Sequence, residues 1–479
     1  MNNPMMIVGL VISIAAIVGL AIFTGMKKKQ GGGKIGFGVV AGLILGTLVG
    51  GSSTVGTAQL AFNYGMSAWW FTLGAGLGCL ILALVYAKRL RAENSPTLVG
   101  MVKNEYGSKA GMAATILNSV GTFINILSQL IAASSVVLVV MPTMGTAWTI
   151  IIAAAVMVLY VVFGGSKGAG IVGILKLILL YVAMVTCGII AYNNLGGMSG
   201  VTSAIKSFSD ELGRNFASLF CRGAGKDMGS CVSLILGVLT TQTYSQAVLT
   251  AKSDKDGITG ALISTFLIPP IGIFGILVGL YMRSVADPAA LADAAQTAVL
   301  AKTALTDFIL NYSGIPPILA GIMLGALFIA SVGTGAGLAL GIATVINREL
   351  IQKKAKNAKL SADNMNKLLI VVVLAVATAL ACTPIGDTIL EFAFMSMGLR
   401  GCTVFAPLCF ALWAKGKVKS NYAFVSIIGG SIVALILGVL NLFKVITLPV
   451  DAVFPGIAVG LVIMLIGLAD KRKNNTLAA

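Results

Sequence analysis

Residues 46–59 read GTLVGGSSTVGTAQ, a run of glycine and hydroxyl residues inside the apolar segment 36–61. Such residues at mid-membrane depth favour a break in a helix, and irregular backbone is tolerated there only where it is buried in protein or lines a cavity. A second interruption, LTTQTYSQ at 239–246, lies in the apolar segment 229–251. Two broken spans at corresponding positions of inverted repeats indicate a transport site. The alternative is that the small residues only permit close helix packing.

The composition is that of a polytopic membrane protein. The chain is 57% hydrophobic and 10% charged, whereas soluble domains are about half apolar and about a quarter charged. A spanning helix needs roughly 20 apolar residues, so we predict an all-α protein with thirteen transmembrane helices and no separate soluble domain. The predicted spans are 5–25, 36–61, 67–88, 110–141, 146–164, 168–192, 229–251, 257–283, 316–347, 364–383, 386–414, 421–443 and 449–470.

The net charge of +17 follows the predicted membrane topology. With the N-terminus outside, 24 of the 33 Lys and Arg residues fall in cytoplasmic loops and the C-terminal tail, which is the positive-inside pattern. We therefore predict a multi-pass protein of the cell membrane with a cytoplasmic C-terminus. Basic stretches such as KRKNN then act as topology anchors, and no nucleic-acid partner is predicted. The first span is predicted to be a retained helix, not a cleaved signal peptide.

Histidine is absent, and the seven cysteines have no metal-ligand spacing. A zinc or haem site is therefore not predicted. A membrane enzyme, which would need clustered His, Asp or Cys at depth, is disfavoured for the same reason. No cofactor is predicted, and a sodium ion is the one open alternative. Cys221 and Cys231 lie in or beside the loop before the seventh span, and a disulfide between them stays open.

Several stretches resemble the sodium:solute symporter family. They are GGSSTVGTAQLAFNYGMSAWWFTLGAGLG at 50–78, SPTLVGMVKNEYGSKAG at 95–111, TTQTYSQAVLTAKSDKDG at 240–257 and GIMLGALFIASVGTGAGLALGIATVINREL at 321–350. The resemblance implies the leucine-transporter superfold, in which spans 2–6 and 7–11 are inverted repeats around a midplane site. The expected parts of this single transporter domain are an extra N-terminal helix and loop (1–34), the first repeat (35–192), an outer loop (193–228), the second repeat (229–415), and two C-terminal helices with a basic tail (416–479).

The resemblance also implies an ion site between the second and ninth spans. In the family this site uses three backbone carbonyls and two hydroxyls. The matched positions are Ser52, Val55 and Ala330 for the carbonyls, and Gly333 and Thr334 for the hydroxyls. Gly333 has no hydroxyl to offer. In the sixth span the family's Asp falls on Gly173 and its Gln on Lys176, so a carboxylate is missing and a cation is added on the same helix.

Lys176 lies inside the apolar run GIVGILKLILLYVAMV, residues 170–185. An ammonium makes demands on carbonyl and hydroxyl oxygens similar to those of sodium, and a second unit charge ~4 Å away is disfavoured by about 4 kcal/mol at an effective dielectric constant of 20. We predict that Lys176 stands in for the ion, which favours sodium-independent or proton-coupled transport. One alternative is a conventional sodium-coupled symporter in which Lys176 snorkels to the interface. The other is a role in binding the substrate.

Uncharged amides and hydroxyls flank both breaks, which suits a small polar organic solute. Arg400 is interpreted either as the partner of a substrate carboxylate or of Glu391, or as part of a structural ion pair or a charge near the membrane interface. Glu391 and Asp387 are alternative proton carriers to Lys176. The lipid bilayer is the other expected partner, and no obligate protein partner is predicted. The candidate substrate-binding residues are Thr54, Gly56, Thr57, Gln59, Gln129, Gln242, Thr243, Tyr244 and Arg400.

Together these patterns favour a secondary active transporter that moves a small polar organic solute across the cytoplasmic membrane by alternating access. A channel would be expected to carry charged or carbonyl-lined filter rings. A channel and a sensor derived from a transporter are the alternatives from other functional classes.

Overall fold

The computed structural model describes residues 4–26, 34–93, 95–164, 169–347, 362–383, 389–443 and 445–476. Within these ranges the chain is helical, and the one β-type pairing is an isolated bridge between Ile35 and Ala251. Nine described helices are long and apolar enough to cross a membrane, or ten if the bent pair α10–α11 is one span, and three shorter apolar helices accompany them. The chain is therefore an all-helical, multi-pass membrane protein.

The helical elements follow one another closely along the chain. Their bounds are α1 Pro4–Met26, α2 Phe37–Leu48, η1 Ser52–Gly56, α3 Thr57–Tyr64, η2 Gly65–Trp69, α4 Trp70–Ile81, η3 Leu82–Tyr86, α5 Ala87–Ala92, α6 Leu98–Val140, α7 Thr146–Gly164, α8 Ala169–Asn194, α9 Gly197–Leu212, α10 Ala224–Thr240, α11 Gln242–Leu249, α12 Asp254–Ser284, α13 Pro288–Ala292, α14 Ala294–Asp307, η4 Phe308–Tyr312, α15 Pro317–Ile346, α16 Ala362–Ala381, α17 Ile389–Trp413, α18 Ser420–Leu442 and α19 Val453–Thr476.

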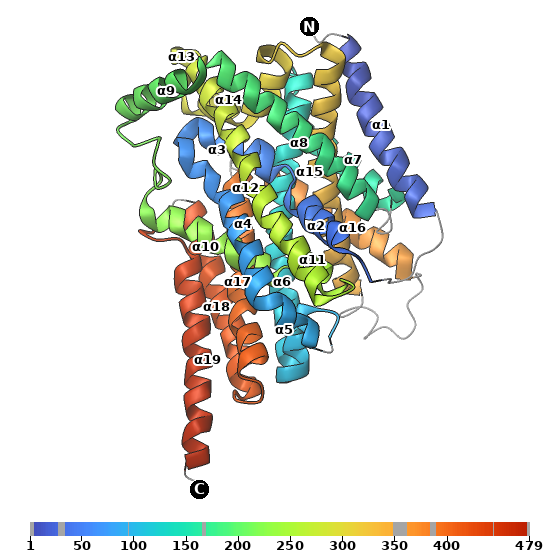
Figure 1. The fold of residues 1–479 in the computed structure, drawn as a ribbon, viewed down its shortest axis with the longest axis vertical. Helices are drawn as coiled ribbons and strands as arrows, with labels where there is room; N and C mark the ends of the chain where they lie inside the picture. The colour runs from blue at the N-terminus through green and yellow to red at the C-terminus, as the bar shows by residue number, and fades with distance from the viewer. Residues whose placement is uncertain are drawn as a thin grey trace.

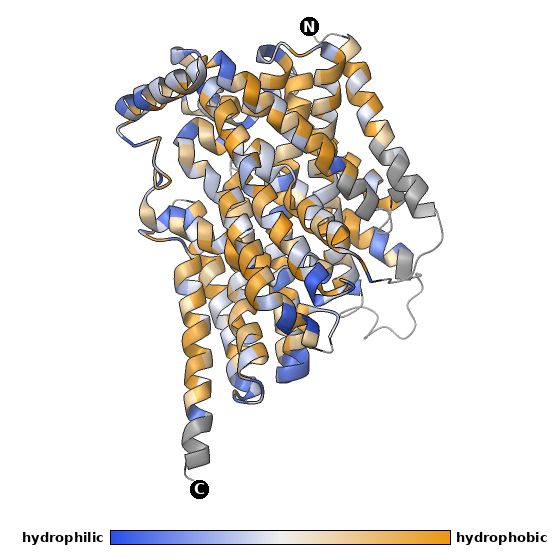
Figure 2. Cartoon of the chain, viewed as in Figure 1, coloured by the Kyte–Doolittle hydropathy of each residue, from blue (hydrophilic) through white to orange (hydrophobic). Residues whose placement is uncertain are grey.

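Helix α6 lies inside the bundle, where it packs against α15 and α17 (Figure 1). Helix α1 runs along α15, and α18 packs on α19. Hydrophobic residues cover the long helices, and hydrophilic residues gather on α9 and near α5, at opposite ends of the molecule (Figure 2). We name the ends by the predicted orientation. The outer end carries Ser67, Asp227 and Glu391, and the inner end carries Pro96 and Gln242.

The first predicted break is present between α2 and η1. Helix α2 ends at Leu48, and Val49 adopts an extended conformation with φ −88° and ψ 105°. Glycines are needed at this break because α6 and α15 approach it closely. A Cβ on Gly51 would lie 2.2 Å from Ser331 Oγ, and one on Gly50 would lie 3.1 Å from Thr334 Oγ1. The backbone then continues as a π-helical turn, η1.

The second predicted break is present between α10 and α11. Thr241 is extended, with φ −86° and ψ 123°, and the two helices are bent by 47° at this residue. Both interruptions therefore lie inside the stretches that the sequence singles out, 46–59 and 239–246.

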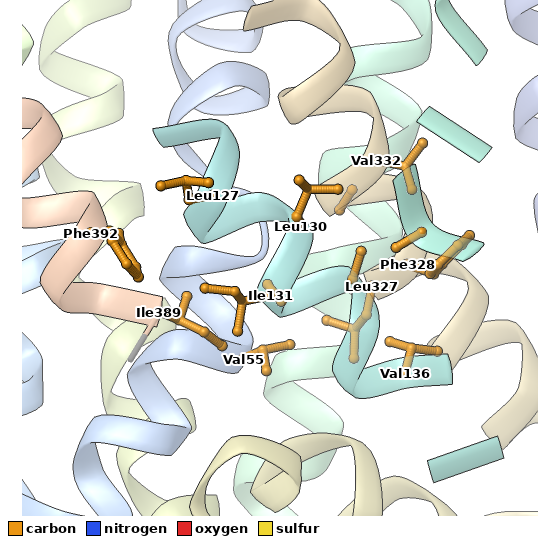
Figure 3. Close-up of a cluster of buried hydrophobic side chains, with 14 of the residues drawn as sticks. Val55, Leu127, Leu130, Ile131, Val136, Leu327, Phe328, Val332, Ile389 and Phe392 are labelled. Atoms are coloured by element: carbon orange, nitrogen blue, oxygen red, sulfur yellow. The ribbon is translucent and has the colours of Figure 1, made fainter. Parts of the chain in front are cut away.

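A buried apolar cluster surrounds the first break. Val55 of η1, Ile131 of α6 and Ile389 of α17 point toward one another, and Leu327 and Phe328 of α15 continue the cluster on the other side of α6 (Figure 3). Because lipid is as apolar as these side chains, the cluster stabilises the bundle mainly through close packing. It fixes the position of η1 among three long helices.

The loop before α10 begins with the helix α9. Helix α9 ends at Leu212 because Gly213 adopts a left-handed conformation with φ +62°. Phe216 therefore lies beyond the helix and packs on Phe208, with 5.7 Å between the ring centroids. The thiols of Cys221 and Cys231 are free in the structure, so the disulfide that the sequence leaves open is not formed.

Candidate functional site

Gln129 of α6 holds the first break by hydrogen bonds. Its Oε1 accepts from Gly51 N at 3.2 Å, and its Nε2 donates to Ser52 Oγ at 2.8 Å. Ser128 Oγ lies 2.8 Å from Ser52 Oγ and donates to Ile389 O at 2.7 Å. The two adjacent side chains of α6 thus join η1 to the start of α17. Gln129, one of the candidate substrate-binding residues, therefore faces the first break.

The other polar residues of this break bond to nearby backbone. Thr54 Oγ1 donates to Gly50 O at 2.9 Å, and Thr57 Oγ1 donates to Ser53 O at 3.1 Å. Both threonine side chains are fully buried. Each threonine hydroxyl thus bonds the carbonyl four residues earlier in the chain. The hydroxyls therefore support the break in this conformation, and their oxygens stay available as acceptors.

Gly56 and Gln59 meet the start of α17. Gln59 Oε1 accepts from Ile389 N at 3.0 Å. A Cβ on Gly56 would lie 2.8 Å from Ile389 Cγ2, so glycine permits this contact. The second half of the broken span and α17 are therefore coupled directly, as expected of helices that line one site.

Lys176 of α8 is buried against α15. Its ammonium donates to Thr334 Oγ1 at 3.0 Å and to Ala330 O at 3.4 Å. The residue is only 5% exposed. Since Gly50 lies beside Thr334, the ammonium lies close to the first break. The geometry does not favour the snorkelling alternative, because the charged atom bonds within the bundle.

The residues at this position do not fit a sodium ion. Ala330 O and Thr334 Oγ1, two oxygens that the resemblance assigns to an ion, both accept from Lys176. Gly333 adds no side-chain oxygen. A protonated amine among these oxygens repels a second cation at the same position. In this structure both oxygens are therefore hydrogen-bonded to the ammonium.

The remaining members of the predicted ion site do not contact Lys176 or lie outside the described residues. Ser52 uses its hydroxyl on α6, and the Val55 side chain belongs to the apolar cluster. Within the described part of the chain, no hydrogen bond joins either of them to Lys176. The surroundings of Gly173, within α8, and the whole of Asp387 lie outside the described residues.

Arg400 of α17 is buried beside the second break. Its Nη1 donates to Thr241 Oγ1 at 2.9 Å, its Nη2 to Ser396 Oγ at 3.0 Å, and its Nε to Ser396 O at 3.2 Å. The residue is 1% exposed, and no described carboxylate lies in ion-pair distance of its guanidinium. Gly121 makes room for this side chain, since a Cβ there would lie 2.7 Å from Arg400 Cγ. The interpretation that Arg400 pairs with Glu391 is therefore wrong.

The predicted residues after the second break do not converge on the first break. Gln242 Oε1 accepts from Leu98 N at 2.9 Å, and its Nε2 donates to Pro96 O at 3.1 Å, so this side chain holds the start of α6. Thr243 is exposed, and Tyr244 is buried in a separate apolar cluster. Only Gln242 of these three lines the cavity described next.

A cavity of about 610 Å³ opens between the first part of α6, α11 and the end of α15. Its polar lining includes Lys103, Asn118, Ser119 and Gln242, and no acidic residue is among the described residues that line it. Asn118 and Ser119 precede Gly121, against which Arg400 packs. Arg400 itself is not among the described residues that line this cavity, and that described lining carries one positive charge and no negative charge.

An ion-pair cluster at the outer end was not predicted from the spacing of residues along the chain. Arg222 bonds Asp227 Oδ1 at 2.7 Å and Glu391 Oε1 at 3.1 Å, and Ser67 Oγ donates to Asp227 Oδ1 at 2.6 Å. Lys226 bonds the same Glu391 oxygen at 3.1 Å. The Arg222 side chain is 2% exposed, and that of Asp227 is fully buried. The cluster ties the outer loop, α10, η2 and α17 together at the end opposite the cavity.

Comparisons with known proteins agree with this architecture. The model of the family "Sodium:solute symporter family" matches residues 30–430. The uncharacterized symporter YwcA of Bacillus subtilis (strain 168) is 26% identical over 278 residues, which is 55% of this chain and 53%, about half, of that protein. A sodium/proline symporter of Staphylococcus aureus (strain USA300 / TCH1516) is 24% identical over 406 residues, 80% of this chain and 74% of the relative.

Two solved structures share the fold. A Na⁺-coupled sialic acid symporter in a substrate-bound, outward-open state has a TM-score of 0.72 at 17% identity, with 98% of each chain covered. A nucleobase-cation-symport-1 family transporter in a closed conformation has a TM-score of 0.54 at 11% identity, with 94% of this chain and 96% of the other covered. At these identities the likeness concerns the fold alone.

Proposed function

The chain belongs to the sodium:solute symporter family, and we propose that it is a solute carrier in which the ammonium of Lys176 stands in for an ion between α8 and α15. Membership of this family makes it a secondary active transporter of a small organic solute, not an enzyme. The proposal that Lys176 replaces an ion rests on one observation. Lys176 Nζ contacts both Thr334 Oγ1 and Ala330 O.

The charge of Lys176 supports sodium-independent transport. A sodium ion bound to the same two oxygens would lie within about 4 Å of the ammonium, and the repulsion is about 4 kcal/mol at an effective dielectric constant of 20. This corresponds to roughly a thousandfold loss of sodium affinity. A buried lysine can also exchange a proton, so proton coupling through Lys176 is part of the proposal, alongside uncoupled transport.

We further propose a carboxylate-bearing solute. Arg400 donates to hydroxyl and carbonyl oxygens, and a buried guanidinium without an anionic partner is costly. A solute carboxylate reaching Arg400 would supply that partner through charge-assisted hydrogen bonds. The cavity beside it carries Lys103 and no acidic residue in its described lining, which favours the passage of an anion. Transport then requires a second conformation that opens the outer end.

The repeat organisation is also proposed. Thirteen spans with residues 35–192 and 229–415 as inverted repeats, and with the N-terminus outside, would make α2–α3 and α10–α11 corresponding elements. Their breaks at Val49–Gly51 and Thr241 support this correspondence. Residues 1–34 and 416–479 would then be additions to the ten-helix core.

Ligand screening followed by uptake tests the proposal. The purified chain is screened by thermal unfolding against acetate, pyruvate, proline, sialic acid and glucose. Uptake of the compound that stabilises the protein is then measured in proteoliposomes, with sodium chloride replaced by choline chloride. We expect a carboxylate to stabilise the chain and its uptake to persist in choline. Strict dependence of uptake on sodium, with an ordinary sodium affinity, contradicts the role of Lys176.

A conventional sodium-coupled symporter is the second candidate, and one observation favours it. Relatives such as the Staphylococcus aureus protein are called sodium/proline symporters. This candidate requires Lys176 to leave Thr334 and Ala330 when sodium binds. The same replacement of sodium by choline separates the two candidates, since it would abolish uptake here.

A further inference from the structure

A second, smaller cavity lies at the outer end, away from Lys176 and Arg400. It has a volume of about 50 Å³ and lies between α10, α17, α18 and the start of α19. Its polar lining residues are Ser233, Glu391, Asn441 and Asp451. A cavity needs about 10–15 Å³ of this kind of volume to hold one water. The space is therefore sufficient for one small ion with a few waters.

In each of the two carboxylates of this cavity, one oxygen accepts no hydrogen bond and forms no ion pair among the described residues. The bonds that Glu391 accepts from Arg222 and Lys226 all reach Oε1. The carboxylate of Asp451 accepts from Val453 N through Oδ1, at 2.9 Å. Among the described residues, no hydrogen bond or ion pair uses Glu391 Oε2 or Asp451 Oδ2. Within the described part of the chain, one oxygen of each of these two carboxylates is thus left without a hydrogen bond or ion pair at this cavity.

The hydroxyl of Ser233 points to a ligand independently of these acids. The residue is 1% exposed, and its Oγ is buried with no hydrogen-bond partner among the described residues. A Cβ on Gly398, which also lines the cavity, would lie 2.7 Å from this oxygen, so Oγ faces the space between α10 and α17. A buried polar atom is normally paired, and a missing partner calls for a bound ion or water.

The net charge around the cavity favours a monovalent cation. The carboxylates of Asp227, Glu391 and Asp451 meet the cations Arg222 and Lys226. Three negative charges against two positive charges leave a net charge of −1 when all groups are ionised. One monovalent cation neutralises this cluster, whereas a divalent ion would reverse its sign.

We propose that this cavity is a binding site for a small monovalent cation, with sodium as the probe. The ligands are Glu391 Oε2, Asp451 Oδ2 and Ser233 Oγ, together with Asn441 Oδ1, which also accepts from Leu448 N at 3.3 Å; water completes the coordination. Carboxylate, hydroxyl and amide oxygens are the donors that hard cations take. The bound ion joins α10, the first half of a broken span, to α17 and to the start of α19. This inference is independent of the role proposed for Lys176.

The experiment compares thermal unfolding of the purified full chain in sodium chloride and in choline chloride at equal ionic strength. We expect a saturable rise in Tm with sodium. Asp451→Asn should weaken the apparent sodium affinity at least about fivefold, because a unit charge ~4 Å away contributes that much even at the dielectric constant of water. Asparagine can still cap α19, so this variant should fold. Ser233→Ala should weaken sodium binding as well.

Two control variants distinguish this cavity from sodium binding elsewhere on the chain. Asp210→Asn removes an exposed carboxylate on α9 and should leave the sodium effect unchanged. Thr334→Ala should also leave it unchanged, because Thr334 lies at Lys176. Equal Tm values in sodium and choline would mean that the cavity holds water or a proton only, and would overturn the inference. An apparent sodium affinity that Asp451→Asn leaves unchanged overturns it too, whereas sodium-dependent uptake overturns only the role of Lys176.

Discussion

Replacing Lys176 with glutamine and Gly333 with serine should create sodium binding between α8 and α15. The first change removes the ammonium that donates to Thr334 Oγ1 and Ala330 O. The second change adds a hydroxyl beside Thr334. A Cβ on Gly333 would meet Tyr160 Oη at 3.6 Å as its nearest neighbour, which is an ordinary contact, so serine fits without displacement.

The expected gain follows from the charge that is removed. An ammonium within about 4 Å of a sodium ion opposes its binding by about 4 kcal/mol at an effective dielectric constant of 20. Loss of this repulsion raises the sodium affinity by roughly a thousandfold. A site that is silent at about 100 mM sodium would then respond at roughly millimolar sodium.

The assay is thermal unfolding over a sodium series, with choline keeping the ionic strength constant. All variants carry Asp451→Asn, so that the proposed outer site is weakened equally in all of them. The matched control replaces Gly333→Ser with Gly337→Ser, one turn further along α15, where a Cβ has no neighbour within 4 Å. The control should respond to sodium more weakly than the Gly333→Ser variant.

Two results would refute this reasoning. One is a folded Lys176→Gln, Gly333→Ser protein whose Tm does not change with sodium. The other is a parent protein, carrying Lys176, that already responds to millimolar sodium in the Asp451→Asn background. Either result means that the ammonium does not decide whether sodium binds.

Three further predictions concern Arg400, Arg222 and Asp451. Arg400→Gln should raise KM for a carboxylate-bearing solute by roughly tenfold to a hundredfold, since hydrogen bonds to charged groups contribute about 1.5–3 kcal/mol, and Arg400→Lys should raise it less; an unchanged KM in uptake kinetics removes the substrate role. Arg222→Ala should destabilise the protein by about 3–5 kcal/mol because it leaves the buried carboxylate of Asp227 without its partner. A second change, Asp227→Asn, should recover part of the lost Tm, and a wild-type Tm in Arg222→Ala contradicts the prediction. Asp451 precedes the spanning helix α19, and burial raises the pKa of its carboxyl group. The charged groups that face it are Glu391, Lys226 and Arg222. Protons should therefore compete with sodium for this carboxylate as the pH falls. The sodium-induced rise in Tm should become smaller as the pH is lowered, and the reverse order would count against the outer site.

Both helix breaks are predictable from the sequence because their cause is local. Gly50 and Gly51 are consecutive and are followed by hydroxyl residues, which weakens the helix α2 at mid-membrane depth. Because the two glycines have no side chains, α6 and α15 can approach the backbone closely. The polar run around Thr241 acts in the same way on α10. The position of Gln129 opposite the first break also follows from collinearity with the family. These features depend on residues that are neighbours along the chain or on one helix face.

The outer cluster and the partners of Arg400 are not predictable in this way. Arg222 reaches Glu391 across 169 residues of sequence, and nothing in the spacing along α17 indicates this pairing. Glu391 is nine residues from Arg400 on the same helix, which places the two side chains about 13 Å apart along the axis and on opposite faces of α17. Arg222 of the outer loop forms the ion pair with Glu391, and Arg400 donates to Thr241 instead.

The role of Gln242 illustrates a different limit. Its amide suits a substrate site by chemistry, yet it bonds the backbone at Pro96 and Leu98, where the loop before α6 needs partners. A sequence does not reveal which backbone groups a loop leaves unpaired. The glutamine lines the cavity and also holds the start of α6.

Solute-driven flux of radioactive ²²Na⁺ tests the role of Lys176 most directly. Proteoliposomes that contain the wild-type chain are given an inward gradient of the solute identified by screening, and ²²Na⁺ entry is measured beside solute entry. Because the Lys176 ammonium occupies the oxygens of α15 that sodium would need, solute should enter with no ²²Na⁺ above the level of liposomes without solute. Entry of ²²Na⁺ in fixed proportion to solute would contradict the proposed role of Lys176.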